Sequence, residues 1–263
     1  RDCFFAPRHL AGRGAQTQGV QMSPLLELRA VTKTFRGLRA ATNISFDVAA
    51  NEMVALVGPN GAGKTTTFNM IAGVFTPDAG EIRFQQQRID GLRADQVCAL
   101  GIGRTFQIAK PFGGLSVLDN VIVGALHRAH DVVEARHRAE NILDQLGLGP
   151  KRDAPAATLT MPERKILEVA RALATRPALL LLDEALAGLR PTECDEMVAV
   201  LKEINQRDGV AIVLIEHVMR AVMALARRVI VLHHGQVIAS GTPGEIVRHP
   251  AVLECYLGED TDL

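Results

Sequence analysis

The sequence contains the stretch Gly58-Pro59-Asn60-Gly61-Ala62-Gly63-Lys64-Thr65, which matches the pattern G-x-x-x-x-G-K-[ST] in full. Glycines let backbone N–H groups close around phosphate oxygens, and a helix that begins at the loop adds the positive end of its dipole. We expect this loop and the following Thr66 to hold a nucleotide, with Lys64 bridging the β- and γ-phosphates and the Thr65 hydroxyl on Mg²⁺. The alternative is a chance glycine turn before a helix.

The residues on either side place this loop between a strand and a helix. Met53 to Val57 is continuously apolar and ends at Gly58, as a buried strand would. Residues 64–72 have helical spacing and stop at Gly73, which is a suitable C-terminal cap. A phosphate loop requires this strand, loop and helix order, so the context favours nucleotide binding over the chance turn.

Two acidic residues follow a second apolar run. Residues 179–182 are four leucines, and they are followed directly by Asp183 and Glu184. A carboxylate is needed in the Mg²⁺ shell, and we expect Asp183 to supply it. Glu184 is the expected base that accepts a proton from the attacking water. By itself such a string would indicate only a strand and a turn, but behind a complete phosphate loop the catalytic interpretation is favoured.

The remaining pattern predicts an α/β fold. Apolar and polar residues alternate around residues 26–30 and 44–48, which indicates half-buried strands of an antiparallel edge sheet. Helical stripes occupy about 92–174. Strands return at 178–182, 210–215 and 229–232, and a turn at His234-Gly235 leads into a further strand at 237–239. Successive strands joined by helices require parallel pairing with crossovers. We therefore expect a P-loop NTPase core with a mixed or parallel sheet, an antiparallel β edge and an inserted helical subdomain at about residues 89–173.

Composition excludes several classes of protein. Hydrophobic residues make up 48% of the chain and charged residues 22%, which is enough apolar material for a packed core and excludes a wholly disordered chain. Lys and Arg total 29, as do Asp and Glu, so no excess positive field is present to hold nucleic acid. No apolar run approaches the roughly 18–20 residues of a membrane-spanning helix. The four cysteines form no C-x-x-C pair and indicate ordinary reduced thiols.

Together these motifs resemble the ATP-binding cassette (ABC) family over nearly all of residues 22–263. The resemblance implies that Phe35 stacks on adenine. It also implies that Gln107 contacts Mg²⁺ and reports on the γ-phosphate, and that His217 is the switch histidine that touches the γ-phosphate. Singly, these residues could be core filler, a polar loop residue and a satisfied histidine. Their order and spacing favour the family roles, alongside Asp183 and Glu184.

Two further stretches resemble the ATP-binding subunits of branched-chain amino-acid importers, namely residues 103–107 and 241–259. The resemblance implies ATP and Mg²⁺ as cofactors, transmembrane permease subunits, a second ATP-binding subunit and, indirectly, a periplasmic or extracellular solute-binding protein. It implies no nucleic-acid partner and a peripheral position on the cytoplasmic face of the inner (plasma) membrane. Residues 1–21 precede Met22 and lack periodicity, so we expect them to be a disordered or non-native extension.

The sequence departs from the family at the signature segment, normally L-S-G-G-Q. The corresponding residues here are Leu159-Thr160-Met161-Pro162-Glu163. Thr160 and Glu163 have the spacing of a capping box, so the helix should still begin here. Pro162, however, has no backbone N–H to donate to a phosphate, and Met161 adds bulk. In the family this segment faces the partner subunit's nucleotide. We therefore expect one weakened composite site, and a heterodimer is favoured over a homodimer.

Two surface features stay open at this stage. Arg190 lies in the loop after Glu184, which crosses the dimer interface in the family, and it could form an ion pair with the partner or be solvated. The permease contact is expected near residues 107–117, including Phe112 and Leu115, although such apolar residues could equally be local packing.

Three functions follow from these expectations. The first is an ATPase subunit that energises an importer of branched-chain amino acids or related small solutes. The second is a soluble cassette protein of DNA repair or translation, which is disfavoured by the neutral charge and by the absence of a long coiled-coil insertion or a second cassette. The third is a nucleotide-sensing, poorly hydrolytic regulatory subunit.

Overall fold

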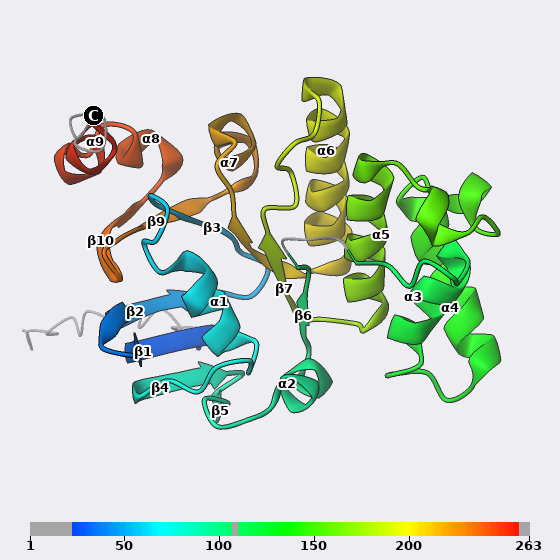
Figure 1. The fold of residues 1–263 in the computed structure, drawn as a ribbon, viewed down its shortest axis with the longest axis horizontal. Helices are drawn as coiled ribbons and strands as arrows, with labels where there is room; N and C mark the ends of the chain where they lie inside the picture. Colours follow the sequence, from blue (N-terminus) through cyan, green and yellow to red (C-terminus); the bar gives the residue numbers. More distant parts are fainter. Residues whose placement is uncertain (1–22, 107–109, 258–263) are drawn as a thin grey trace, which may run out of the picture.

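The core of the molecule is a six-stranded sheet in the order β10-β9-β3-β8-β7-β6 (Figure 1). The computed structural model describes residues 23–106 and 110–257. All neighbouring strands pair in parallel except β10, which runs antiparallel to β9. The strands are β3 (Met53–Val57), β6 (Ile102–Arg104), β7 (Leu179–Asp183), β8 (Ala211–Ile215), β9 (Arg228–His233) and β10 (Gln236–Gly241).

Alternation along the buried strands divides the core into two clusters. In β3, Val54 and Leu56 join one cluster, while Ala55 and Val57 join the other. All five residues of β3, β7 and β8 are buried, as expected for parallel strands covered on both faces. The continuous apolar runs in the sequence are therefore explained by a sheet enclosed between two layers.

One of these layers is a second, antiparallel sheet in the order β2-β1-β4-β5. Its strands are β1 (Leu26–Phe35), β2 (Leu38–Val48), β4 (Ala79–Phe84) and β5 (Gln87–Arg88). Leu26 and Leu28 of β1 are fully covered, whereas Arg29 and Ala30 are exposed. The predicted antiparallel β edge is confirmed, and it packs with helix α1 (Lys64–Ile71) on one face of the six-stranded sheet.

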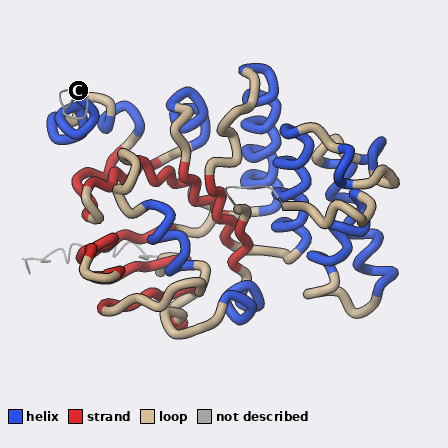
Figure 2. Tube along the Cα trace, in the orientation of Figure 1, coloured by secondary structure: helices blue, strands red, loops and turns tan. Residues whose placement is uncertain are grey.

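Helices cover the opposite face and extend away from it, as Figure 2 shows. The helices beside the core are α5 (Met161–Ala174), α6 (Pro191–Asp208), α7 (Met219–Leu225), α8 (Pro243–Ile246) and α9 (Pro250–Leu257). The outlying helical part comprises α3 (Val117–Ala125), α4 (Val132–Gln145) and the 3₁₀ turns η1 (Gly149–Lys151) and η2 (Ala156–Thr158), and it packs on α5.

The segment expected to be helical from about residue 92 also contains a strand. After α2 (Ala94–Leu100), residues 102–104 form β6, which pairs in parallel with β7 at the edge of the core sheet. Gly103 and Arg104 interrupt a stripe that has helical spacing, and the edge of the sheet supplies the hydrogen bonds that make this short strand possible. The expectation of helices throughout was therefore wrong for residues 102–104.

The strand order gathers three strand ends at one edge. Leu56 of β3 and Asp183 of β7 both pair with Ile215 of β8. The loop after β3, the residues after β7 and the residues after β8 consequently emerge side by side. Within the described residues, no helix combines the length and apolarity needed to span a membrane. The expectation for residues 1–21 concerns a stretch outside the described residues.

Candidate nucleotide site

The phosphate loop adopts a backbone that excludes side chains at two glycines. Gly58 has φ 148° and Gly63 has φ 97°. A Cβ at Gly58 would lie 2.0 Å from the carbonyl oxygen of Leu232, and one at Gly63 would lie 2.3 Å from that of Ala40. Both contacts are with backbone and are impossible for any larger residue, so the loop can follow this path only with glycine.

Lys64 is buried inside the curve of the loop. Its Nζ donates to the carbonyl oxygens of Gly58 at 2.6 Å and Pro59 at 2.7 Å. The ammonium group therefore lies within the ring of backbone that would surround phosphates. Thr65, the next residue of α1, is exposed, and Thr66 is half-buried. The remaining predicted loop residues, Asn60, Gly61 and Ala62, lie between these two ends of the loop.

Asp183 is the last residue of β7, and its side chain is buried. Its Oδ2 accepts from Arg104 Nη2 at 3.2 Å, and its backbone N–H donates to Thr105 Oγ1 at 3.2 Å. Its Oδ1 is buried and has no hydrogen-bond partner among the described residues. Burial raises the pKa of this carboxyl, against the opposing effect of the Arg104 guanidinium. A buried, unsatisfied carboxylate oxygen suits a divalent cation.

Glu184 follows in a left-handed backbone conformation. Its φ is 51°, which is uncommon for a residue with a side chain, and its N–H donates to the carbonyl of Ile215 at 2.9 Å. Its Oε1 lies 3.2 Å from Nε2 of His217, the second residue after β8. The structure thus brings together two predicted catalytic residues that are 33 positions apart in the chain.

Phe35 lies at the end of β1, and 37% of its surface is exposed. Its ring meets Phe75 edge-on at a centroid distance of 5.1 Å, and Lys33 Nζ lies 5.6 Å from its centroid. A partly exposed ring that is held by a second aromatic can receive a flat base on its free surface. Phe35 is therefore not core filler.

The signature segment begins helix α5. Leu159 is buried, Thr160 is the N-cap, and the Thr160 N–H donates to Glu163 Oε2 at 2.9 Å. Pro162 lies in the first helical turn, and 62% of Met161 is exposed. The Lys151 ammonium, 2.5 Å from the Glu163 carboxylate, lowers its pKa and holds it charged. The expected capping contact is present, and a bulky side chain stands where the family pattern has glycine.

Two further expectations concern Arg190 and Gln107. Arg190 does form an ion pair, but with Glu193 of its own chain at 2.5 Å, and its side chain is 80% exposed. Gln107 lies outside the described residues.

Sequence reasoning missed three residues that contact this site. Arg104 pairs with Asp183 and donates to Asn69 Oδ1 at 2.6 Å. Lys165 and Glu216 bond to the backbone that follows Glu184. Glu216 could have been suspected because an acidic residue at the end of a buried strand is unusual. Nothing in the local sequence predicts the contact made by Lys165, because a lysine in a helix is typical of an exposed surface position.

Comparison with known proteins agrees with this geometry. The model of the family described as ABC transporter matches residues 41–187. The chain belongs to the ABC transporter family. The C-terminal residues 236–262 match the model described as branched-chain amino acid ATP-binding cassette transporter. This ABC protein is therefore a member of a family of ATPases, and its nucleotide is ATP.

Relatives cover nearly the whole chain. The high-affinity branched-chain amino acid transport ATP-binding protein LivG of Salmonella typhimurium is 36% identical over 90% of this chain and 98% of its own length. The ADP conformation of MJ1267, an ATP-binding cassette of an ABC transporter, is 27% identical with a TM-score of 0.81, and the match covers 90% of this chain and 99% of that one. A dimeric post-hydrolysis structure of the cassette MJ0796 with ADP and Pi matches with a TM-score of 0.76 at 26% identity, over 83% and 98% of the two chains.

Proposed function

We propose that this chain is the ATP-hydrolysing subunit of an importer for branched-chain amino acids or closely related solutes. The observation on which this rests is the convergence of the phosphate loop, Asp183 and the Glu184–His217 pair at one edge of the sheet. The solute class is supported by the match of residues 236–262 and by the likeness to LivG.

Each residue has a part in the proposed reaction. Backbone N–H groups of the loop and the N-terminus of α1 hold the phosphates, and the Lys64 ammonium exchanges the carbonyls of Gly58 and Pro59 for phosphate oxygens. The Glu184 carboxylate accepts a proton from the attacking water. His217, already within hydrogen-bonding distance of Glu184, orients that carboxylate and contacts the γ-phosphate. Phe35 packs against adenine.

A magnesium ion fits the acidic side of the site. Asp183 Oδ1 is a buried oxygen without a partner among the described residues, and the Thr65 hydroxyl is exposed at the start of α1. These two oxygens are the proposed ligands, with Gln107 as the third. When bound, Mg²⁺ neutralises charge that develops on the phosphate oxygens.

The second ATP-binding subunit completes the site in this proposal. The dimeric cassette structure among the similar proteins supports a pair of ATP-binding subunits. The family resemblance implies that the pair is head to tail, with each nucleotide between one phosphate loop and the other chain's signature segment. The segment here lacks a donor at Pro162, and a lost hydrogen bond to a charged group costs roughly 1.5–3 kcal/mol. A heterodimer with a partner that has an intact signature is therefore favoured, with the competent site on this chain's Lys64, Asp183 and Glu184.

A groove beside β6 is the proposed contact with the permease subunits. It has a volume of about 260 Å³, and its lining includes Val74, Cys98, Phe106 and Val123 from the core and the helical part. Phe106, Val74 and Val123 are each about half exposed. The groove lies beside the expected contact region, and it would place the chain on the cytoplasmic face of the membrane through its partners, with the solute-binding protein on the other side.

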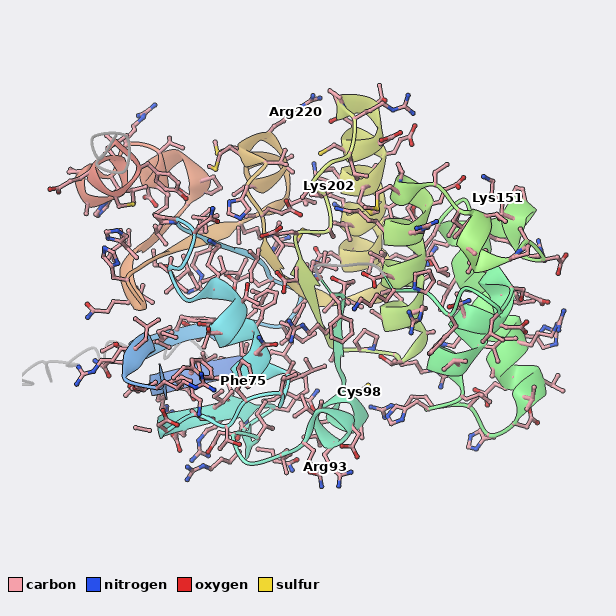
Figure 3. All side chains as sticks on the ribbon, viewed as in Figure 1. Phe75, Arg93, Cys98, Lys151, Lys202 and Arg220 are labelled. Carbon is pink, nitrogen blue, oxygen red and sulfur yellow. The ribbon has the colours of Figure 1, made fainter. Side chains whose placement is uncertain are left out.

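The proposal is tested by reconstituting the chain with its permease subunits, its companion ATP-binding subunit and the solute-binding protein. ATP hydrolysis should rise on addition of branched-chain amino acids, and Glu184→Gln should reduce turnover at least a hundredfold. Lys202→Met, on the exposed face of α6, is the matched control and should leave turnover unchanged (Figure 3).

The result also separates the other functions. ATP binding without turnover by the complete wild-type assembly would favour the regulatory subunit. Purification without membrane proteins, together with solute-independent turnover, would favour the soluble cassette.

A further inference from the structure

The backbone that follows Glu184 forms a tight turn with its first and last carbonyls close together. The N–H of Ala187 donates to the carbonyl of Glu184 at 3.2 Å, which closes the turn over residues 184–187. Because Glu184 has a φ of 51°, the direction of its side chain depends on this turn keeping its shape.

Lys165 of helix α5 contacts both ends of this turn. Its Nζ donates to the carbonyl of Glu184 at 3.0 Å and also to the carbonyl of Ala187. One ammonium group therefore holds both ends of the turn. With its N–H bonded to Ile215 and its carbonyl bonded to Lys165, the backbone of Glu184 is fixed on both sides.

A second buried side chain holds the middle of the same turn. Glu216, at the end of β8, accepts from the N–H of Leu186 at 2.7 Å and is only 2% exposed. Glu216 precedes His217, so the turn is bonded to the segment that supplies the histidine partner of Glu184. The clamp thus consists of Lys165 on α5 and Glu216, the first residue after β8, so that it joins two separate parts of the chain.

Burial of the Lys165 ammonium group costs hydration free energy, so its position calls for compensating contacts. The residue is 9% exposed, and burial lowers its pKa even though Glu216, Glu184 and Glu168 act in the opposite direction. A lysine at the surface would avoid this loss of hydration. An apolar residue of the same length would fill the space at lower cost, but it could not bond to the two carbonyls.

We propose that Lys165 is a positioning residue for hydrolysis, which fixes the backbone of the 184–187 turn so that the Glu184 carboxylate is directed at His217 and the attacking water. This inference rests on the proposed role of Glu184 as the base. It assigns no contact between Lys165 and the nucleotide. The consequence is a specific kinetic signature, because loss of Lys165 should slow the chemical step and leave the binding of ATP in place.

The test compares Lys165→Met and Lys165→Arg in the reconstituted transporter, with MgATP as substrate and Lys202→Met as the exposed control. We expect Lys165→Met to lower kcat at least tenfold, with KM for MgATP and the affinity for a fluorescent ATP analogue within twofold of wild type. Lys165→Arg, which keeps charged donors, should recover at least a third of the wild-type kcat. A purely structural role would lower nucleotide affinity or the melting temperature instead, and Arg would not restore kcat selectively.

Three results decide the matter. A folded Lys165→Met variant with kcat within twofold of wild type overturns the inference. If that variant does not fold, Lys165→Gln, which can donate to one carbonyl, replaces it, and an intermediate kcat supports positioning while a wild-type kcat overturns it. If the wild-type protein shows no turnover, or shows turnover that Glu184→Gln leaves unchanged, the proposed function itself is contradicted. If the wild type and Lys165→Met are both active and Glu184→Gln is inactive, only this inference is contradicted.

Discussion

At the scale of single residues, the site contains buried carboxyl groups that have fewer hydrogen-bond partners than their oxygens can accept. Asp183 keeps one oxygen unsatisfied within the described residues, and burial raises the pKa of both Asp183 and Glu216. Such groups are costly in a stable core and are typical of sites where charge is needed for chemistry. Arg104 is the counterion that makes the burial of Asp183 tolerable.

Removal of Arg104 should destabilise the fold more than removal of an exposed partner. Arg104→Met leaves the buried Asp183 carboxylate without its ion pair, and we expect a loss of about 3–5 kcal/mol in the free energy of unfolding. The matched control is Arg136→Met, which breaks an exposed pair with Glu140 and should cost less than about 1 kcal/mol. Urea unfolding measures both, and equal losses would contradict the importance of the buried pair.

Glu216 should make stability depend on pH in a defined window. Burial raises its pKa from 4.5 to about 7. Between these values the unfolded chain releases the proton while the folded chain keeps it, so the free energy of unfolding falls as pH rises, by about 3 kcal/mol in total. Glu216→Gln removes this contribution, so the variant should gain stability relative to wild type from pH 5 to 7.5. Parallel stability curves for the two proteins would show that Glu216 titrates normally.

At the scale of elements, helix α5 serves two regions of the site. Its N-terminus carries the signature segment, and its second turn supplies Lys165 to the loop after β7. The capping contact between Thr160 and Glu163 keeps the helix start intact although the glycines of the family pattern are missing. The departure therefore leaves formation of the helix unaffected, and in the proposed dimer it concerns recognition of the partner's nucleotide.

Restoration of the two glycines should raise activity at the partner's site. Met161→Gly with Pro162→Gly supplies a backbone donor and removes an exposed side chain, and we expect turnover at that site to increase about tenfold or more, in line with 1.5–3 kcal/mol for one hydrogen bond to a charged group. Helix propensity loses about 1 kcal/mol for a glycine in place of a methionine, so a small fall in melting temperature is also expected. Steady-state hydrolysis with this chain's own base removed by Glu184→Gln isolates the partner's site, and unchanged turnover would show that the signature is not limiting.

At the scale of the whole molecule, the six-stranded sheet joins the nucleotide site to the groove beside β6. The helical part packs on α5 (Figure 1). The groove is lined by residues of α2, β6, α3 and α5. Permease docking in that groove would bring the membrane subunits next to Arg104, the residue that pairs with Asp183.

Cys98 offers a direct test of the docking face. It is half-buried on α2 and lines the groove, whereas Cys194 and Cys255 are buried. We expect a maleimide to label Cys98 in the free chain and to label it at least tenfold more slowly in the assembled transporter. Cys98→Ser identifies the labelled site. Equal labelling rates would place the permease elsewhere.

The local pattern of the sequence was sufficient for the phosphate loop, the buried strands that end at Val57 and Asp183 and the start of α5, because each depends on neighbours within a few residues. Alternation along the chain also indicated the strands of the antiparallel edge, although β1 pairs with β4, which lies far from it in the sequence. The local pattern was not sufficient for β6, whose hydrogen bonds come from β7, some 77 positions away. The pairing of Glu184 with His217, the counterion Arg104 and the clamp of Lys165 and Glu216 likewise depend on strand order and on how α5 packs against the loop after β7. Periodicity specifies which face of an element is buried, but only tertiary packing specifies which polar groups meet there.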